Sequence, residues 1–148
     1  MAEAGYSGTP LIRKLGFRPG QRALFVALPP ELRPVLAEFG GFADRAEAKD
    51  IAEPPPGARD LILAFECERA ALAAALPVLR ARLDPAGMLW VCWPKKAARV
   101  PTTLTEDVIR ALALAAGLVD VKVCAVDAVW SGLKLVIPLA LRPGGRGA

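Results

Sequence analysis

Apolar residues in this chain form short continuous runs that alternate with segments of helical spacing. Continuous runs of strand length lie at residues 22–28, 60–65 and 88–93, and further strand patterns lie at 42–48, 119–126 and 133–139. Helical spacing is found at 31–39, 68–83 and 103–116, with a shorter helix at 10–15. Strands that are apolar on both faces are typical of a parallel sheet covered by helices. The pattern predicts an α/β fold, a Rossmann-like three-layer sandwich with a mainly parallel sheet.

Turn and cap residues set the limits of these elements. Thr103 and Thr105 compete as the N-cap of the last predicted helix, and Thr103 with Glu106 fits a capping box. Pro77 predicts a kink or a break in the preceding helix. The sequence DPAG at 84–87 predicts a turn before the next strand.

The link between the last two strands, residues 127–132, is too short for a crossover helix. These strands are therefore expected to pair antiparallel or to lie one strand apart. We expect a single domain over residues 1–141, followed by a flexible tail at 142–148.

Composition narrows the chemistry. The chain has 148 residues, of which 54% are hydrophobic, so a disordered chain is excluded. It contains no histidine, which excludes histidine-ligated metals and Ser-His-Asp or Cys-His nucleophile pairs. The three cysteines have irregular spacing that fits neither a disulfide framework nor a zinc site. No metal is expected.

The chain is expected to be cytoplasmic. Its opening residues include Glu3 and lack an apolar core, so they do not form a signal peptide. No stretch reaches the ~18 uninterrupted apolar residues of a membrane span. The net charge of +4 and the 6% of aromatic residues are too modest to predict nucleic-acid binding, although Arg13, Lys14, Arg18 and Arg22 form a basic cluster around the first helix.

The second half of the chain resembles a class I S-adenosylmethionine-dependent methyltransferase. The resemblance rests on the strand, helix and DPAG turn before MLWV at 88–91, then on a helix that ends in AGLV at 116–119 and on two closing strands. It implies a sheet of order 2-1-3-4-6-5 along the chain, with an antiparallel last strand, and S-adenosylmethionine as the cofactor.

Four blocks also resemble a family of short bacterial proteins, the domain of unknown function 3052 family. They are GYSGTPL at 5–11 with KLG at 14–16, WPKK at 93–96, LTED at 104–107 and WSGLKLV at 130–136. This resemblance implies a fold and a bacterial source, and it implies no activity.

The chain departs from the methyltransferase pattern after the first strand. There the family places a glycine-rich turn, whose backbone N–H groups approach the cofactor. Here residues 28–32 read LPPEL, which has no glycine and loses two N–H donors at Pro29 and Pro30. The segment from Pro29 to Arg59 is also too short for the usual elements, so one strand is missing and the fold is truncated.

Ligands of open parallel sheets bind at the carboxyl ends of the strands. At that edge, Trp93 is followed by Lys95, Lys96 and Arg99, which could hold a phosphate or a carboxylate, or stack a base. The alternative is a solvated loop in which Pro94 only ends the strand.

Two other segments are predicted to reach the same edge. Glu66 could face Lys95 as an acid or base, or Glu66 and Glu68 could only favour the start of a helix. The N-terminal arm, with Tyr6 and Ser7, is expected to fold over the edge.

The cysteines and one tryptophan leave alternatives open. Cys92 has lysines nearby that would lower its thiol pKa, but its strand position makes it core, as is also expected of Cys124. Cys67 is expected to be better exposed. Trp130 marks an interface if it is exposed and closes the sheet edge if it is buried. We expect self-association through this C-terminal strand edge.

Two classes of function follow. The first is a non-catalytic binding module for a small anionic ligand or a protein partner at the edge from Trp93 to Arg99. The second is a methyltransferase with an atypical cofactor site. The sequence leaves open whether the chain is an enzyme.

Overall fold

A six-stranded mixed sheet forms the centre of the computed structural model, which describes residues 10–37 and 39–143. The strands are β1 (Arg22–Val26), β2 (Asp44–Ala48), β3 (Arg59–Phe65), β4 (Leu83–Pro94), β5 (Val119–Ala125) and β6 (Trp130–Val136). Their order is β2-β1-β3-β4-β6-β5, with β1–β4 parallel. β6 runs antiparallel to both of its neighbours. The predicted sheet order is confirmed, and the last two strands pair directly.

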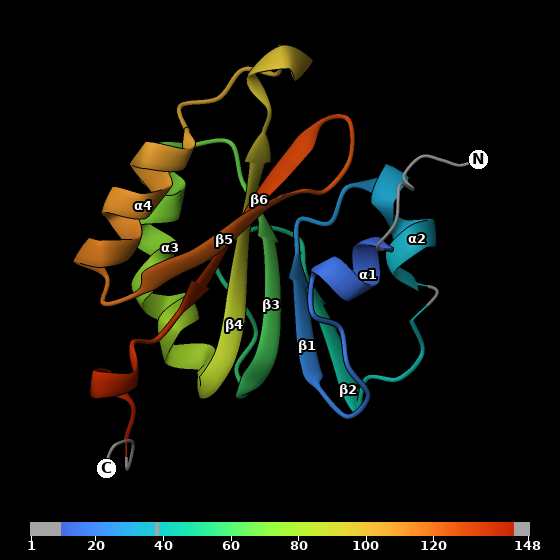
Figure 1. The fold of residues 1–148 in the computed structure, drawn as a ribbon, viewed down its shortest axis with the longest axis vertical. Helices are drawn as coiled ribbons and strands as arrows, with labels where there is room; N and C mark the ends of the chain where they lie inside the picture. Colours follow the sequence, from blue (N-terminus) through green and yellow to red (C-terminus); the bar gives the residue numbers. More distant parts are fainter. Residues whose placement is uncertain (1–9, 38, 144–148) are drawn as a thin grey trace.

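Helices cover both faces of this sheet (Figure 1). They are α1 (Leu11–Lys14), α2 (Arg33–Ala37), α3 (Arg69–Arg82) and α4 (Glu106–Ala115). Leu24 and Ile62 pack in one core with α3 and α4, whereas Phe25 and Leu63 pack in a second core with Leu15 and α2. Burial of both strand faces explains the continuous apolar runs.

The predicted turn at 84–87 is wrong in one respect, because these residues belong to β4. Arg59 pairs with Leu83 and Leu61 pairs with Met88, so β4 bulges between the two pairs. A Cβ on Gly87 would lie 2.9 Å from the carbonyl oxygen of Asp60. The bulge therefore needs glycine at this position.

The two threonines that compete for one helix start cap different helices. The Thr105 hydroxyl accepts the Val108 N–H at 3.2 Å and caps α4. The Thr103 hydroxyl instead accepts the Arg69 N–H at 2.6 Å, at the start of α3. The capping box of Thr103 with Glu106 is therefore wrong, because tertiary packing brings Thr103 to another helix.

The ends of the two longer helices follow the sequence closely, whereas β6 begins at Trp130, three residues before the strand predicted at 133–139. Gly117 ends α4 with a φ of +82°. α3 continues past Pro77 as one helix, so no break occurs there. In the predicted tail, Arg142 donates from Nε to the carbonyl oxygen of Ile137 at 2.8 Å, and residues 144–148 lie outside the described part. No helix of the described residues has the length and apolar character that crossing a membrane requires.

Candidate functional site

A cavity of about 490 Å³ opens at the carboxyl end of β4. Its lining includes the buried Trp93 and the lysines Lys95 and Lys96. Thr102, Thr105 and Ser131 also line the cavity, and the hydroxyls of Thr102 and Thr105 are engaged by backbone groups. The predicted edge therefore does contain a cavity, and three of the predicted residues line it.

The loop after β4 is fixed by its backbone. Lys95 donates its N–H to the carbonyl oxygen of Val129 at 2.7 Å, which ties the loop to the β5–β6 hairpin. A short 3-10 turn over Lys96–Ala98 follows. Arg99 then adopts a left-handed φ of +57° and is not among the residues that line the cavity. Arg99 is thus an exposed turn residue, as the solvated-loop alternative has it.

The cavity wall also includes one acid that the sequence analysis missed, Glu106. Its carboxylate is held by Arg110, which also binds Asp107 at 2.9 Å and Asp120 at 3.1 Å. Among the described residues, Lys95 and Lys96 have no such partner. The cavity therefore offers two unneutralised cations beside an acid that is already paired. Sequence spacing could have flagged the i,i+4 pair of Glu106 with Arg110, but not its place in the wall.

Glu66 does not reach this cavity. Its carboxylate accepts the N–H groups of Cys67 at 3.0 Å and of Glu68 at 2.9 Å. The Glu66 N–H donates to the carbonyl oxygen of Cys92. Its position fits the alternative in which it favours the start of α3, and no contact with Lys95 is observed. Tyr6 and Ser7 lie outside the described residues.

The cysteines are placed as packing residues. Cys92 is fully buried, and burial raises its thiol pKa well above the usual value, so the expected effect of the lysines is absent. Burial, together with Glu66 and Glu68, also raises the pKa of the half-buried Cys67. Burial raises that of Cys124, which is half-buried rather than fully in the core. None of these pKa shifts favours a thiolate nucleophile.

Trp130 is half-buried and packs against Phe65 with ring centroids 5.1 Å apart and an interplanar angle of 88°. This edge-to-face contact fits the alternative in which the indole closes the sheet edge. Within the described residues, no group of three histidine, cysteine, aspartate or glutamate side chains could hold a metal ion.

A cavity of about 270 Å³ lies at the carboxyl ends of β1 and β2, and an ion pair forms part of its lining. Arg33 binds Glu47 through both guanidinium nitrogens, at 2.9 Å each, and this contact lowers the pKa of the Glu47 carboxyl. In the loop after β1, Ala27 adopts a left-handed φ of +54°, and Pro29 and Pro30 come two residues later. The Arg33–Glu47 pair was missed because it depends on the pairing of β2 with β1.

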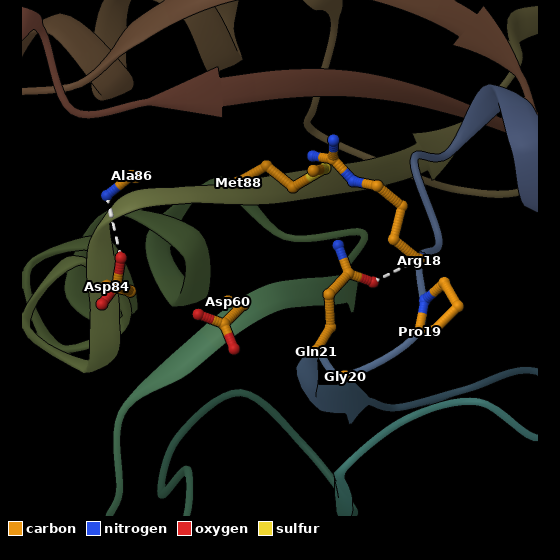
Figure 2. A pocket seen from close by; sticks show the side chains of 8 residues that line it. All are labelled: Arg18, Pro19, Gly20, Gln21, Asp60, Asp84, Ala86 and Met88. Carbon is orange, nitrogen blue, oxygen red and sulfur yellow. Dashed lines mark hydrogen bonds between the residues drawn. The ribbon is translucent and has the colours of Figure 1, made fainter.

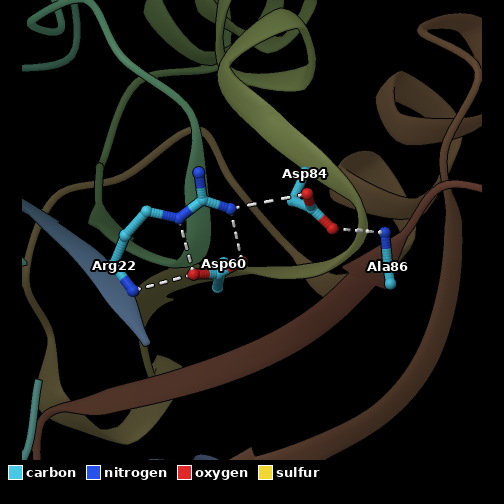
Figure 3. Close-up of polar contacts among 4 residues, drawn as sticks. All are labelled: Arg22, Asp60, Asp84 and Ala86. Atoms are coloured by element: carbon cyan, nitrogen blue, oxygen red, sulfur yellow. Dashed lines mark hydrogen bonds and ion pairs between the residues drawn. The ribbon is translucent and has the colours of Figure 1, made fainter. Parts of the chain in front are cut away.

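A second cavity, of about 350 Å³, lies at the amino ends of the strands (Figure 2). Asp60, Asp84 and Arg18 are among its lining residues. The Asp60 carboxylate accepts from Nε of Arg22 at 2.9 Å and from Nη2 at 2.8 Å, and it also accepts the Arg22 N–H (Figure 3). Asp84 lies 3.4 Å from the same guanidinium. These acids are thus engaged in joining β1, β3 and β4.

Comparisons with known proteins support the fold at a coarse level. No family model matches the chain, so membership of the domain of unknown function 3052 family is not supported by that comparison. No curated protein matches either. Solved structures do match, and several of them are methyltransferases.

Three of these structures illustrate the similarity. An O-methyltransferase family 2 protein from Planctomyces limnophilus, in complex with apigenin, has a TM-score of 0.62 at 14% identity, covering 81% of this chain and 50% of its own. An O-methyltransferase from neocarzinostatin biosynthesis, in complex with S-adenosylmethionine, has a TM-score of 0.63 at 11% identity, covering 79% of this chain and 49% of its own. Magnesium protoporphyrin IX methyltransferase from Synechocystis PCC 6803 has a TM-score of 0.58 at 14% identity, covering 86% of this chain and 74% of its own.

The chain spans about half the length of the first two structures. This coverage fits a truncated methyltransferase-like fold. At these identities the similarity concerns the fold alone.

Proposed function

We propose that this chain is a non-catalytic binding module that takes a small anionic ligand in the cavity above Trp93. The observation that carries the proposal is that Lys95 and Lys96 line a cavity of about 490 Å³ and have no ion-pair partner among the described residues. Charge-assisted hydrogen bonds from ammonium groups are strong where the surroundings are partly dry. The buried Trp93 in the lining supplies such surroundings.

The form of the β1–β2 edge supports a non-catalytic role. A cofactor that is held by backbone N–H groups needs donors after β1, and Pro29 and Pro30 provide none. In the cavity of about 270 Å³ at this edge, the Glu47 carboxylate is already paired with Arg33. The edge therefore offers few free hydrogen-bonding groups to a cofactor.

The proposal is tested by calorimetric titration of the purified chain with ATP, S-adenosylmethionine and S-adenosylhomocysteine. We expect saturable binding of ATP, used as an anionic probe, and no heat from the other two. Lys95→Met should weaken ATP binding roughly tenfold, the usual effect of losing one charge-assisted contact. Lys49→Met removes an exposed lysine from the β1–β2 edge and serves as the matched control. Equal ATP affinity in both variants would overturn the proposal.

The alternative function is an S-adenosylmethionine-dependent methyltransferase with an atypical cofactor site. The methyltransferase-like fold and the left-handed Ala27 after β1 favour it. Micromolar binding of S-adenosylmethionine that is lost in Trp93→Ala would support this alternative and would justify a search for a methyl-accepting substrate.

We also infer that a second copy of the chain is a partner at the C-terminal strand edge. Leu114 of α4 is 58% exposed, and Val121 and Val123 of the edge strand β5 are 52% and 45% exposed. Exposed apolar side chains beside an unpaired strand are typical of an association surface.

A further inference from the structure

Two lysines face each other across the β5–β6 hairpin. Lys122 of β5 is directly opposite Lys134 of β6 in the antiparallel register. Like charges at directly opposite positions destabilise a sheet. Lys134 is half-buried, and burial together with Lys122 and Arg18 lowers its pKa. The hairpin thus carries an electrostatic cost, and neither lysine has an ion-pair partner among the described residues.

Two more cations come from the N-terminal part of the chain. Arg18, in the loop before β1, acts on Lys134, and Lys14 of α1 acts together with Lys122 on the neighbouring Cys124. In the described part of the chain, none of these four cations takes part in an ion pair. We call Lys14, Arg18, Lys122 and Lys134 the basic face.

The basic face lies on the side of the sheet opposite the Trp93 cavity. Lys134 is the register partner of Trp90. Trp90 packs in the α1–α2 core and donates its indole N–H to the carbonyl oxygen of Leu15 at 2.9 Å. Trp93, three residues further along β4, packs in the α3–α4 core. The two basic regions therefore cannot share one ligand.

A hollow adjoins the basic face. Arg18 lines the cavity of about 350 Å³ at the amino ends of the strands. Figure 2 shows its side chain extending over Met88, on the far side of the cavity from Asp60 and Asp84. Arg22 already engages both acids. The cationic side of this cavity is therefore the side that remains available for a ligand.

We propose that the basic face is a second ligand site, and that it binds a small phosphate-bearing molecule at the Arg18 side of the cavity. A dianionic phosphate has several acceptor oxygens, so one group can contact a guanidinium and two ammonium groups at once. Its charge would offset the repulsion between Lys122 and Lys134. A nucleic acid is disfavoured, because the chain has few aromatic residues for stacking bases and a modest net charge.

The test is calorimetric titration of the full chain with pyrophosphate at low ionic strength, combined with thermal unfolding. We expect saturable binding that weakens roughly tenfold in Lys134→Met. Without pyrophosphate, Lys134→Met should raise the Tm, because it removes the cross-strand repulsion. With pyrophosphate, its Tm should rise less than that of the unmodified chain. The higher Tm without pyrophosphate and the smaller Tm rise with pyrophosphate together distinguish a lysine that binds the ligand from a lysine with a structural role alone.

Lys95→Met separates this inference from the function proposed above, and Lys49→Met is again the matched control for one lost positive charge. Pyrophosphate binding that persists in Lys95→Met and is lost in Lys134→Met supports the basic face, whatever happens at the Trp93 cavity. Binding that is lost in Lys95→Met and kept in Lys134→Met overturns it. Binding of a duplex oligonucleotide without any response to pyrophosphate also overturns it, in favour of a nucleic-acid surface.

Discussion

At the scale of single residues, the ion pair of Arg22 with Asp60 has the clearest physical consequence. The Asp60 carboxylate accepts three hydrogen bonds from Arg22, and this contact lowers the Asp60 pKa in the folded chain. A lowered folded pKa stabilises the fold at every pH above the ordinary aspartate pKa. That contribution is lost as the pH falls from the ordinary value through the folded pKa.

Asp60→Asn should therefore lower the Tm at neutral pH by about 3 °C, a modest effect because the pair is partly exposed. The difference from the unmodified chain should shrink as the pH falls below about 4, where the aspartate itself becomes protonated. Thermal unfolding followed by circular dichroism between neutral and acidic pH measures the Tm loss at neutral pH and its decrease at acidic pH. Asp50→Asn, in an exposed turn, controls for lost charge. A Tm difference that does not change with pH would show that the ion pair is not its source.

At the scale of elements, Thr103 shows that a helix start can depend on a distant residue. Thr103 lies far along the chain from α3, yet its hydroxyl accepts the first N–H of that helix. Thr103→Val should cost about 1 kcal/mol of the free energy of unfolding, the usual effect of losing a cap, and Thr103→Ser should cost far less. Urea titration of both variants measures the difference. A larger loss in Thr103→Ser than in Thr103→Val would mean that the methyl group, which valine keeps and serine lacks, matters more than the hydroxyl.

The same scale shows what the sequence could predict. The apolar runs of β1, β3 and β4 identified the buried strands, and glycine identified the end of α4, because burial and left-handed backbone leave local signals. The sheet order came from resemblance and was confirmed. Long-range pairings left no such signal. The contacts of Arg33 with Glu47, and of Thr103 with the start of α3, depend on strand register and loop packing.

At the scale of the whole molecule, the two edges of the sheet differ. The amino edge is fastened by Arg22, Asp60 and Asp84, whereas the carboxyl edge holds the larger cavity, at Trp93. The ion pairs that join β1, β3 and β4 and the cavity at Trp93 therefore lie at opposite ends of the same sheet. The edge strand β5 has only one neighbour in the sheet, β6, and is the place where a second copy could add contacts.

The backbone of β5 decides whether a second copy would pair with this strand or pack against its side chains. Its pairing with β6 shifts register between Asp120 and Lys122, and such a bulge hinders direct pairing with a further strand. Association should therefore use the side chains of Leu114, Val121 and Val123. We expect the chain to be a dimer at micromolar concentration by light scattering, and Val123→Lys to convert it to a monomer. Val35→Lys, at a valine of α2 with similar exposure, should remain dimeric. A monomeric unmodified chain would contradict this prediction directly, since the exposed apolar surface would then be stable in water without a partner.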